Sequence, residues 1–251
     1  MKNVFIMGAS SGIGLELAEI LASRGVKLAL AARHTETMRE LKGKYPELVE
    51  YASIDITHKD APAKMRDLAE KAGGIDIYIH ISGIGYENPG LDPEREVDIV
   101  RTNACGFARM VSAAYNYFRE AGKAGQIAAV TSIAGTNGIG LLSAYSASKA
   151  FDQTYIVALR QLANKEKTGI TFTDIRPGWV RTPLLKPGEA YPLEIDVDFA
   201  ARRILKAIVR KEKVAVIDWR WDVISRLWRV LPDSIWTKMD VKISSPASPQ
   251  P

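Results

Sequence analysis

Short apolar runs alternate along this chain with segments in which apolar residues recur every three or four positions. The first run, residues 4–7, has no polar alternation, which is typical of a strand buried on both faces of a sheet. Ile13, Leu17, Ile20 and Leu21 then follow at helical spacing. The same alternation predicts further strands at residues 26–32, 49–54, 75–81, 126–132, 170–175 and 214–217, and helices at 35–44, 59–71, 94–119, 144–165 and 199–210.

This alternation predicts an α/β fold. We expect a single-domain, doubly wound parallel sheet of about seven strands with helices on both faces, in the Rossmann-like arrangement. The length of 251 residues suits one large domain. We expect this domain to span residues 1–217, followed by a helical extension at 218–243 and a disordered Ser/Pro-rich tail at 244–251.

The net charge of +5 is concentrated near the C-terminus. From residue 200 to the end there are 11 basic and 5 acidic residues, whereas the preceding 199 residues carry 23 basic and 24 acidic ones. A near-neutral body argues against nucleic acid as a partner. One cysteine and three scattered histidines predict neither a disulfide framework nor a metal site. No apolar run reaches the roughly 18–20 residues of a membrane-spanning helix, so we expect a cytoplasmic protein.

A glycine-rich turn, Gly-Ala-Ser-Ser-Gly-Ile-Gly, lies between the first predicted strand and the first predicted helix. Glycines permit a tight turn and a close approach of the backbone to a pyrophosphate, and the helix N-terminus supplies free N–H groups. Because the motif stands at this strand-to-helix junction, a nucleotide site is favoured over a turn without a ligand. The predicted contacts are Gly8, Ser10, Ser11, Gly12, Ile13 and Gly14.

The end of the second predicted strand bears on the choice of cofactor. In Rossmann-like folds an acidic residue at this point pairs with the ribose hydroxyls of NAD. Here the strand ends in Ala-Ala-Arg, and no carboxylate follows until Glu36. The guanidinium of Arg33 can pair with a 2′-phosphate, so the sequence favours NADP (NADPH) over NAD. The alternative is that Arg33 is an ordinary solvated charge.

A Ser, a Tyr and a Lys form the candidate catalytic set. Ser132 ends the fifth predicted strand, and Tyr145 and Lys149 stand four residues apart on the next helix, so they share one face. A nearby ammonium stabilises a phenolate, which allows the Tyr to exchange a proton with a carbonyl or alcohol oxygen. Ser132 can hydrogen-bond the same oxygen, whereas hydride chemistry belongs to a cofactor.

The glycine spacing and this Ser/Tyr/Lys set together resemble the short-chain dehydrogenase/reductase family, over residues 1 to about 217. The resemblance implies an NAD(P)-binding catalytic domain, in which Asn103 holds a water in a proton relay through Lys149. It implies that Asp55 contacts the adenine ring. It also implies a homodimer or homotetramer, built on the two long helices after the fourth and fifth strands. The remaining implied cofactor contacts are Ile56, Gly83, Tyr145, Lys149, Pro177, Gly178, Val180 and Thr182.

The chain departs from the family pattern in two places. Met7 replaces a Thr before the first glycine, and His80-Ile81-Ser82-Gly83 replaces the usual Asn-Asn-Ala-Gly. Gly83 is kept, so close approach to the cofactor survives. We interpret His80 as a buried histidine whose hydrogen bonds are satisfied, and Cys105 as a small buried apolar residue.

The C-terminal extension contains four of the five tryptophans. A helical wheel over residues 221–231 places Trp221, Val223, Ile224, Leu227, Trp228, Val230 and Leu231 in one half and Asp222, Ser225, Arg226 and Arg229 in the other. One interpretation is that this helix packs on the body or across a subunit interface and shapes one wall of the substrate site. The other is peripheral membrane contact through residues 219–236.

These features predict an NADPH-dependent oxidoreductase that interconverts a ketone and a secondary alcohol. The apolar area of the C-terminal extension would border the variable loop at residues 183–199, which favours a lipophilic substrate such as a 3-ketoacyl chain, a 3-keto sphingoid base or a steroid. The alternative from a different class is a non-catalytic NADP-binding sensor or scaffold. An epimerase or dehydratase is less favoured, because the chain lacks the extra domain that such relatives often carry.

Overall fold

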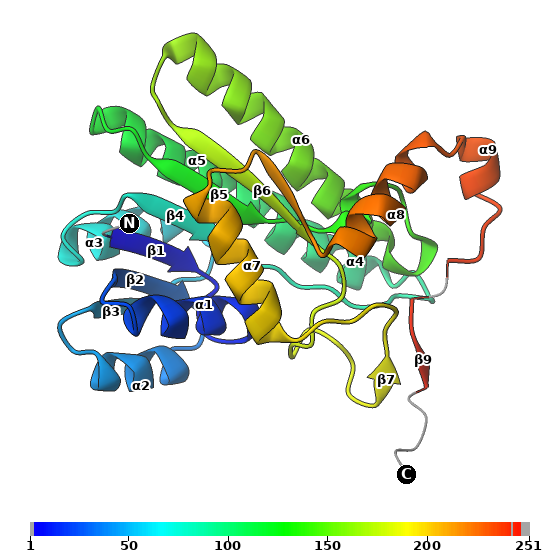
Figure 1. The fold of residues 1–251 in the computed structure, drawn as a ribbon, viewed down its shortest axis with the longest axis horizontal. Coiled ribbons are helices and arrows are strands. Elements are labelled where there is room, and N and C mark those ends of the chain that lie inside the picture. The colour runs from blue at the N-terminus through cyan, green and yellow to red at the C-terminus, as the bar shows by residue number, and fades with distance from the viewer. Residues whose placement is uncertain (1–2, 242, 247–251) are drawn as a thin grey trace.

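The computed structural model describes residues 3–241 and 243–246. Within these residues, seven parallel strands form one sheet in the order β3-β2-β1-β4-β5-β6-β8 (Figure 1). The strands are β1 (Asn3–Met7), β2 (Lys27–Ala32), β3 (Val49–Ser53), β4 (Ile77–His80), β5 (Gln126–Val130), β6 (Thr171–Pro177) and β8 (Val214–Ile217). The predicted α/β fold with its doubly wound sheet is confirmed.

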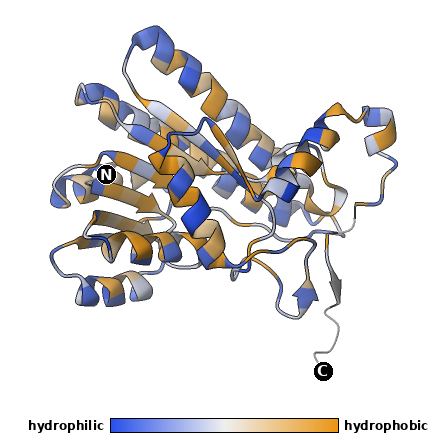
Figure 2. Cartoon of the chain, viewed as in Figure 1, coloured by the Kyte–Doolittle hydropathy of each residue, from blue (hydrophilic) through white to orange (hydrophobic). Residues whose placement is uncertain are grey.

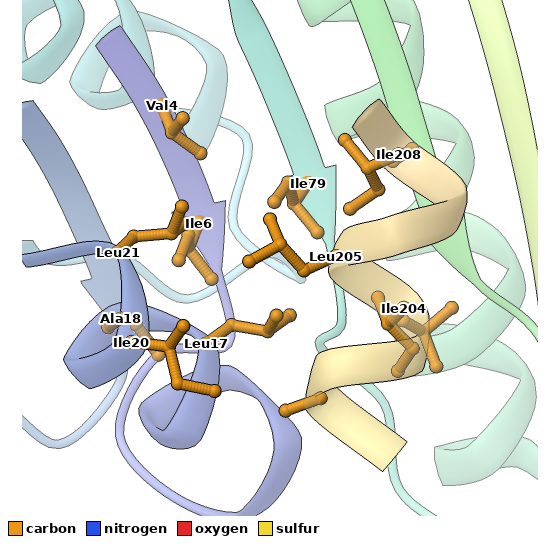
Figure 3. Packing of buried hydrophobic residues seen from close by; sticks show 14 of the residues in the cluster. Val4, Ile6, Leu17, Ala18, Ile20, Leu21, Ile79, Ile204, Leu205 and Ile208 are labelled. Atoms are coloured by element: carbon orange, nitrogen blue, oxygen red, sulfur yellow. The ribbon is translucent and has the colours of Figure 1, made fainter. Parts of the chain in front are cut away.

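Helices cover both faces of the sheet because successive strand residues point to opposite sides. Val4 and Ile6 of β1 join one apolar cluster, whereas Phe5 and Met7 join the other. In the first cluster, α1 and α7 meet over β1 and β4 (Figure 3). This first layer comprises α1 (Gly12–Ala22), α2 (Glu36–Lys44) and α7 (Val197–Val209), and the second comprises α3 (Ala61–Lys71), α5 (Phe107–Glu120) and α6 (Ser143–Glu166).

The direction of winding reverses between β1 and β4, which are neighbours in the sheet but not in the chain. Ligands of doubly wound folds bind outside the carboxyl ends of the strands at such a point. The glycine-rich turn follows β1 at this place. The central strands are mostly hydrophobic in Figure 2, whereas the surrounding helices mix hydrophobic and hydrophilic positions.

The helix predicted at 94–119 is confirmed, but its middle turn is π-helical and not α-helical. The structure has α4 (Pro93–Val100), a π-helical segment (Arg101–Gly106, η1) and then α5. Single π-helical turns inside α-helices are frequent at functional sites, because the wider turn redirects side chains. Here the π turn carries Asn103, whose side chain points to the loop after β4 and to α6.

The C-terminal segment folds back on the body as α8 (Trp219–Val230) and α9 (Asp233–Trp236). A third apolar cluster joins this segment to the loops around the carboxyl end of β5, through residues that include Ala134, Leu142, Trp236 and Ile243. A two-stranded antiparallel pair, β7 (Glu189–Ala190) and β9 (Ser245–Pro246), was not predicted. Of the predicted disordered tail, residues 244–246 are therefore placed, and 247–251 lie outside the described residues. None of the helices described is long and apolar enough to cross a membrane.

Candidate active site

A cavity of about 660 Å³ lies at the carboxyl ends of the central strands. One end is formed by the glycine-rich turn and the ends of β2 and β3, and the other by apolar side chains of the C-terminal segment. Of the residues that the sequence predicted for the site, the cavity is lined by Gly8, Ser10, Ser11, Gly12, Ile13, Arg33, Asp55, Ile56, Gly83, Ser132, Tyr145, Lys149, Pro177, Gly178, Val180 and Thr182. Gly14 and Asn103 lie behind this surface.

The glycine-rich turn is packed so closely that no side chain fits at Gly8 or Gly14. Gly8 has φ +98°, and a Cβ there would lie 2.6 Å from the Ser82 nitrogen. A Cβ on Gly14 would lie 1.9 Å from the Gly8 carbonyl oxygen. Ser11, the N-cap of α1, does not cap the helix with its side chain. The first turn of α1 therefore presents backbone N–H groups to the cavity, an arrangement that fits a pyrophosphate.

The residues predicted to choose the cofactor lie beside this turn. Arg33 is exposed at the end of β2 and forms no side-chain ion pair within the described part of the chain. Asp55 accepts hydrogen bonds from the backbone N–H and the hydroxyl of Thr57, at 2.8 and 2.7 Å. Although burial opposes it, these bonds lower the pKa of Asp55, so the carboxylate is ionised. The turn, Arg33 and Asp55 together suit a dinucleotide.

Ser132 lies just after β5 and is held from two sides. Its hydroxyl oxygen accepts a hydrogen bond of 3.1 Å from the Ala134 backbone N–H, and its carbonyl accepts one of 2.7 Å from Gln153 of α6. The acceptor role leaves the hydroxyl proton free to be donated into the cavity. Its backbone is extended, and the residue lines the cavity.

Tyr145 and Lys149 lie on the same face of α6, as the spacing predicted. The Lys149 ammonium lies 5.8 Å from the centre of the Tyr145 ring. Gly85 packs against this ring, since a Cβ there would lie 2.7 Å from two ring carbons. Lys149 is buried, and its ammonium donates to the Val130 carbonyl at 3.4 Å and to Asp152 at 3.3 Å.

Asp152 is a site residue that the sequence reasoning missed. It is fully buried, and one of its two carboxylate oxygens has no hydrogen-bond partner within the described residues. Burial raises its pKa to about 7, against the attraction of Lys149. Burial also disfavours the Lys149 ammonium, but Asp152 and Tyr145 outweigh this and raise the pKa of Lys149. A Lys and an Asp three residues apart on one helix form no recognisable sequence motif, so the sequence alone did not reveal this pair.

The raised pKa of Asp152 predicts a pH-dependent stability that Asp152→Asn removes. The folded chain holds this proton up to about pH 7, whereas the unfolded chain releases it near 3.8. The resulting stabilisation is fully present below the unfolded pKa and is lost as the pH rises through the folded pKa, at about 1.4 kcal/mol per pH unit. Denaturant unfolding at about pH 5 and about pH 8 should show wild type losing stability relative to the variant. The exposed Asp67→Asn is the matched control, and parallel curves for wild type and Asp152→Asn would contradict the assignment.

Asn103 braces the loop after β4 against α6. Its amide oxygen accepts from the Ile84 N–H at 2.8 Å, and its amide nitrogen donates to the Ile84 carbonyl at 2.7 Å and to Ser148 at 3.2 Å. A Cβ on Gly83 would lie 3.2 Å from the Asn103 amide oxygen and 3.6 Å from the Lys149 ammonium nitrogen. Gly83 therefore keeps the space between these two polar groups free of side-chain atoms.

The two further sequence predictions near the site have different outcomes. His80 is buried as expected, and Nδ1 lies 3.0 Å from the Tyr78 hydroxyl, but Nε2 has no partner within the described residues. Burial lowers its pKa to about 3, so the ring is neutral. Cys105 is exposed, so its predicted burial is wrong. Cys105 lies on the same solvent-facing side of the helix as Arg101, whereas the three residues between them are buried.

The apolar end of the cavity is built largely by the C-terminal segment. Trp221, Ile224 and Trp228 of α8 line it together with Val241 and Ile243. Trp221 covers Gly178, where a Cβ would lie 2.1 Å from the indole nitrogen. The indole N–H of Trp221 is buried against Gly178 and has no hydrogen-bond partner within the described residues.

The comparisons with known proteins agree with this architecture. A model of the family described as short chain dehydrogenase matches residues 2–191. An uncharacterized oxidoreductase of Myxococcus xanthus is 33% identical over 242 residues, which cover 94% of each chain. A solved short-chain dehydrogenase from Sphingobium yanoikuyae in complex with NADPH is 24% identical, with a TM-score of 0.77 over 96% of this chain and 97% of that chain. Another from Burkholderia cenocepacia, in complex with NADP, is 22% identical, with a TM-score of 0.80 over 94% of this chain and 97% of that one.

Proposed function

The chain belongs to the short-chain dehydrogenase family of NAD(P)-dependent oxidoreductases, and we propose that it interconverts a lipophilic ketone and its secondary alcohol, with NADPH as the hydride donor. One observation carries this proposal. The side chains of Ser132, Tyr145 and Lys149 line a single cavity, between an end that suits a dinucleotide and an end walled by apolar side chains. This arrangement suits a carbonyl group attached to a hydrophobic body.

The proposed roles follow from what each side chain can donate. Tyr145 protonates the carbonyl oxygen in reduction and takes the proton back in oxidation. Ser132 holds the same oxygen with its free hydroxyl proton. Lys149 stabilises the phenolate that Tyr145 leaves after donating, and its own charge is supported by Asp152 at 3.3 Å. Asn103 takes part through a water in the space that Gly83 keeps open beside Lys149.

The choice of NADPH rests on Arg33. Its exposed guanidinium stands at the rim of the cavity beside the glycine-rich turn, where a 2′-phosphate would meet a positive charge. The carboxylate of Asp55 lies at the end of the next strand and is already engaged by Thr57. The two structural neighbours in complex with NADPH and NADP are consistent with this choice.

The substrate class rests on the far end of the cavity. Trp179 packs against Tyr191 with the ring planes tilted by 40° and the ring centres 4.8 Å apart. Trp221 and Trp228 line the same cavity from α8. A 3-ketoacyl chain, a 3-keto sphingoid base or a steroid-like ketone would bury its hydrocarbon there. For the side of α8 that carries Trp221 and Trp228, these contacts support the interpretation that the C-terminal helix packs on the body and shapes a wall of the substrate site.

Two further proposals concern assembly and the alternative function. Exposed apolar residues on α4 and α6, among them Val97, Val100 and Val157, support a homodimer or homotetramer through these helices. The hypothesis of a non-catalytic sensor or scaffold is disfavoured, because cofactor binding alone does not require Ser132, Tyr145 and Lys149 to line one cavity.

A panel of ketones and alcohols sorted by chain length, assayed with NADPH and NADH in parallel, tests the proposal. We expect kcat/KM to rise with hydrocarbon length, since each buried methylene contributes about 0.8 kcal/mol, or about fourfold. We expect NADPH to support faster turnover than NADH. Tight NADPH binding without turnover of any member of the panel would favour the sensor reading.

Arg33→Ala tests the predicted preference for NADPH over NADH in the same assay. Losing a charge-assisted bond to the 2′-phosphate should raise KM for NADPH by about 10- to 100-fold and leave NADH kinetics unchanged. Arg39→Ala, an exposed arginine on the next helix, is the matched control. An equal effect of Arg33→Ala on both cofactors would contradict the assigned contact.

A further inference from the structure

Helix α8 presents apolar side chains on two opposite faces, which the sequence had combined into one. Trp221 and Ser225 are buried against the body, and Trp228 is partly buried beside them. On the opposite side of the helix, Trp219, Val223, Leu227 and Val230 are 50–75% exposed. These four residues, called the outer stripe below, follow one another at helical spacing and belong to none of the three core clusters of the described residues.

A second cavity of about 660 Å³ lies beside the outer stripe, between α7, β8 and α8. Its lining includes Arg203 and Lys206 from α7 and Arg210 just after that helix. Trp219 and Arg229 line it from α8. Two other lining arginines already have partners, since Arg226 pairs with Asp222 at 2.8 Å and Arg176 with Asp174 at 2.6 Å.

The ion pairs leave this cavity with a positive excess. Asp218, its remaining lining aspartate, pairs with Arg220 at 2.6 Å. In the described part of the chain, Arg203, Lys206, Arg210 and Arg229 take part in no ion pair, and Glu212 is the one lining carboxylate that is also free of one. Four cations against one carboxylate, within reach of solvent, favour an anion with several oxygen atoms.

We propose that the second cavity binds the phosphate headgroup of an anionic phospholipid and that the outer stripe enters the adjoining acyl boundary, so that α8 docks the chain on an anionic membrane surface. Trp and aliphatic side chains flanked by arginine are suited to this boundary. A second copy of this chain would bring the same cations against each other, and a nucleic acid would leave the outer stripe in water. This inference concerns binding alone and does not depend on the proposed reaction.

The arrangement also relates the membrane to the substrate. The inner face of α8 forms part of the wall of the candidate active site, and its outer face forms the docking surface. One helix therefore separates the bilayer from the apolar end of that cavity. A hydrophobic ketone taken from the bilayer would have only a short distance to travel.

Vesicle flotation with the full-length chain tests the docking. The vesicles are phosphatidylcholine alone or phosphatidylcholine with phosphatidylglycerol. Arg203→Gln with Arg210→Gln and Arg229→Gln should weaken binding to phosphatidylglycerol vesicles about 100-fold at low salt. Trp219→Ser with Leu227→Ser should weaken it at least about 10-fold. The matched controls are Leu91→Ser, which removes a leucine of the same 59% exposure as Leu227, and Arg39→Gln with Lys123→Gln and Lys165→Gln, which removes three exposed charges elsewhere.

Each outcome decides the proposal. The proposal is supported if binding requires phosphatidylglycerol, falls with salt, is lost in both test variants and is kept in both controls. Absence of wild-type binding, or equal binding to both kinds of vesicle, overturns it. If only the charge variant loses binding, the second cavity is a site for soluble phosphates and the docking is wrong. If Trp219→Ser with Leu227→Ser instead changes the oligomeric state in light scattering, the outer stripe is an interface between copies and the docking is again overturned.

Discussion

Replacing Tyr145 with Phe should abolish NADPH-dependent ketone reduction while leaving NADPH binding intact. The change removes one hydroxyl, and the aromatic ring keeps its contacts with Gly85 and the Lys149 ammonium. Without that hydroxyl nothing else in the proposed mechanism protonates the carbonyl oxygen, and general acid–base catalysis contributes about 10²–10⁴-fold to a rate. We expect kcat, measured by NADPH consumption, to fall by about 10²- to 10⁴-fold. The Kd for NADPH is measured separately by fluorescence titration.

Tyr155→Phe is the matched control for this experiment. Tyr155 lies on the same helix, α6, and is partly buried against Phe151 and Phe107, outside the candidate active site. Its substitution should leave kcat unchanged. Retained turnover in Tyr145→Phe would mean that another group supplies the proton. Reduced NADPH binding in the same variant would mean that the phenol holds the cofactor rather than the proton.

The parts of the fold that the sequence predicted are those with local signals. A parallel strand buried on both faces needs an uninterrupted apolar run, and each of β1, β2 and β5 has one. The glycine-rich turn and the four-residue spacing of Tyr145 and Lys149 are equally local, because turn and helix geometry fix which atoms meet. The cavity residues of this turn and of the Ser132, Tyr145 and Lys149 set were found in this way. The predicted cavity residues at positions 55, 56, 83, 177, 178, 180 and 182 came from the family resemblance and not from a local pattern.

The remaining features depend on contacts between distant segments. Asp152 acquires its raised pKa only because the surrounding fold buries it, and the nearby Lys149 ammonium offsets this burial only in part. The π turn at Asn103 is accompanied by hydrogen bonds to Ile84 and Ser148, which no helical pattern encodes. The helical wheel found the apolar half of α8, but only the docking of Trp221 over Gly178 separates an inner face from an outer stripe.

Gly14→Ala should have the largest effect among substitutions in the glycine-rich turn, although Gly14 does not line the cavity. The added Cβ would lie 1.9 Å from the Gly8 carbonyl oxygen, 2.8 Å from its carbon and 3.2 Å from the Cα of Ala9. All three are backbone atoms, so no side chain can rotate away and the first turn of α1 must move. We expect a loss of about 1–3 kcal/mol in unfolding free energy from overpacking. We also expect about 100-fold weaker NADPH binding, because the N–H groups of α1 no longer meet the pyrophosphate together.

Gly43→Ala separates this clash from the general effect of adding a methyl group to a helical glycine. Gly43 lies in α2, is exposed, and would have no atom within 4 Å of its Cβ. Its substitution should stabilise the fold by about 0.5–1 kcal/mol, since alanine loses less backbone entropy than glycine. If the close contact is the cause, denaturant unfolding should show Gly14→Ala less stable and Gly43→Ala more stable than wild type. NADPH titration should show weaker binding for Gly14→Ala alone. A folded Gly14→Ala protein that binds NADPH as tightly as wild type would show that the pyrophosphate does not rest on this turn.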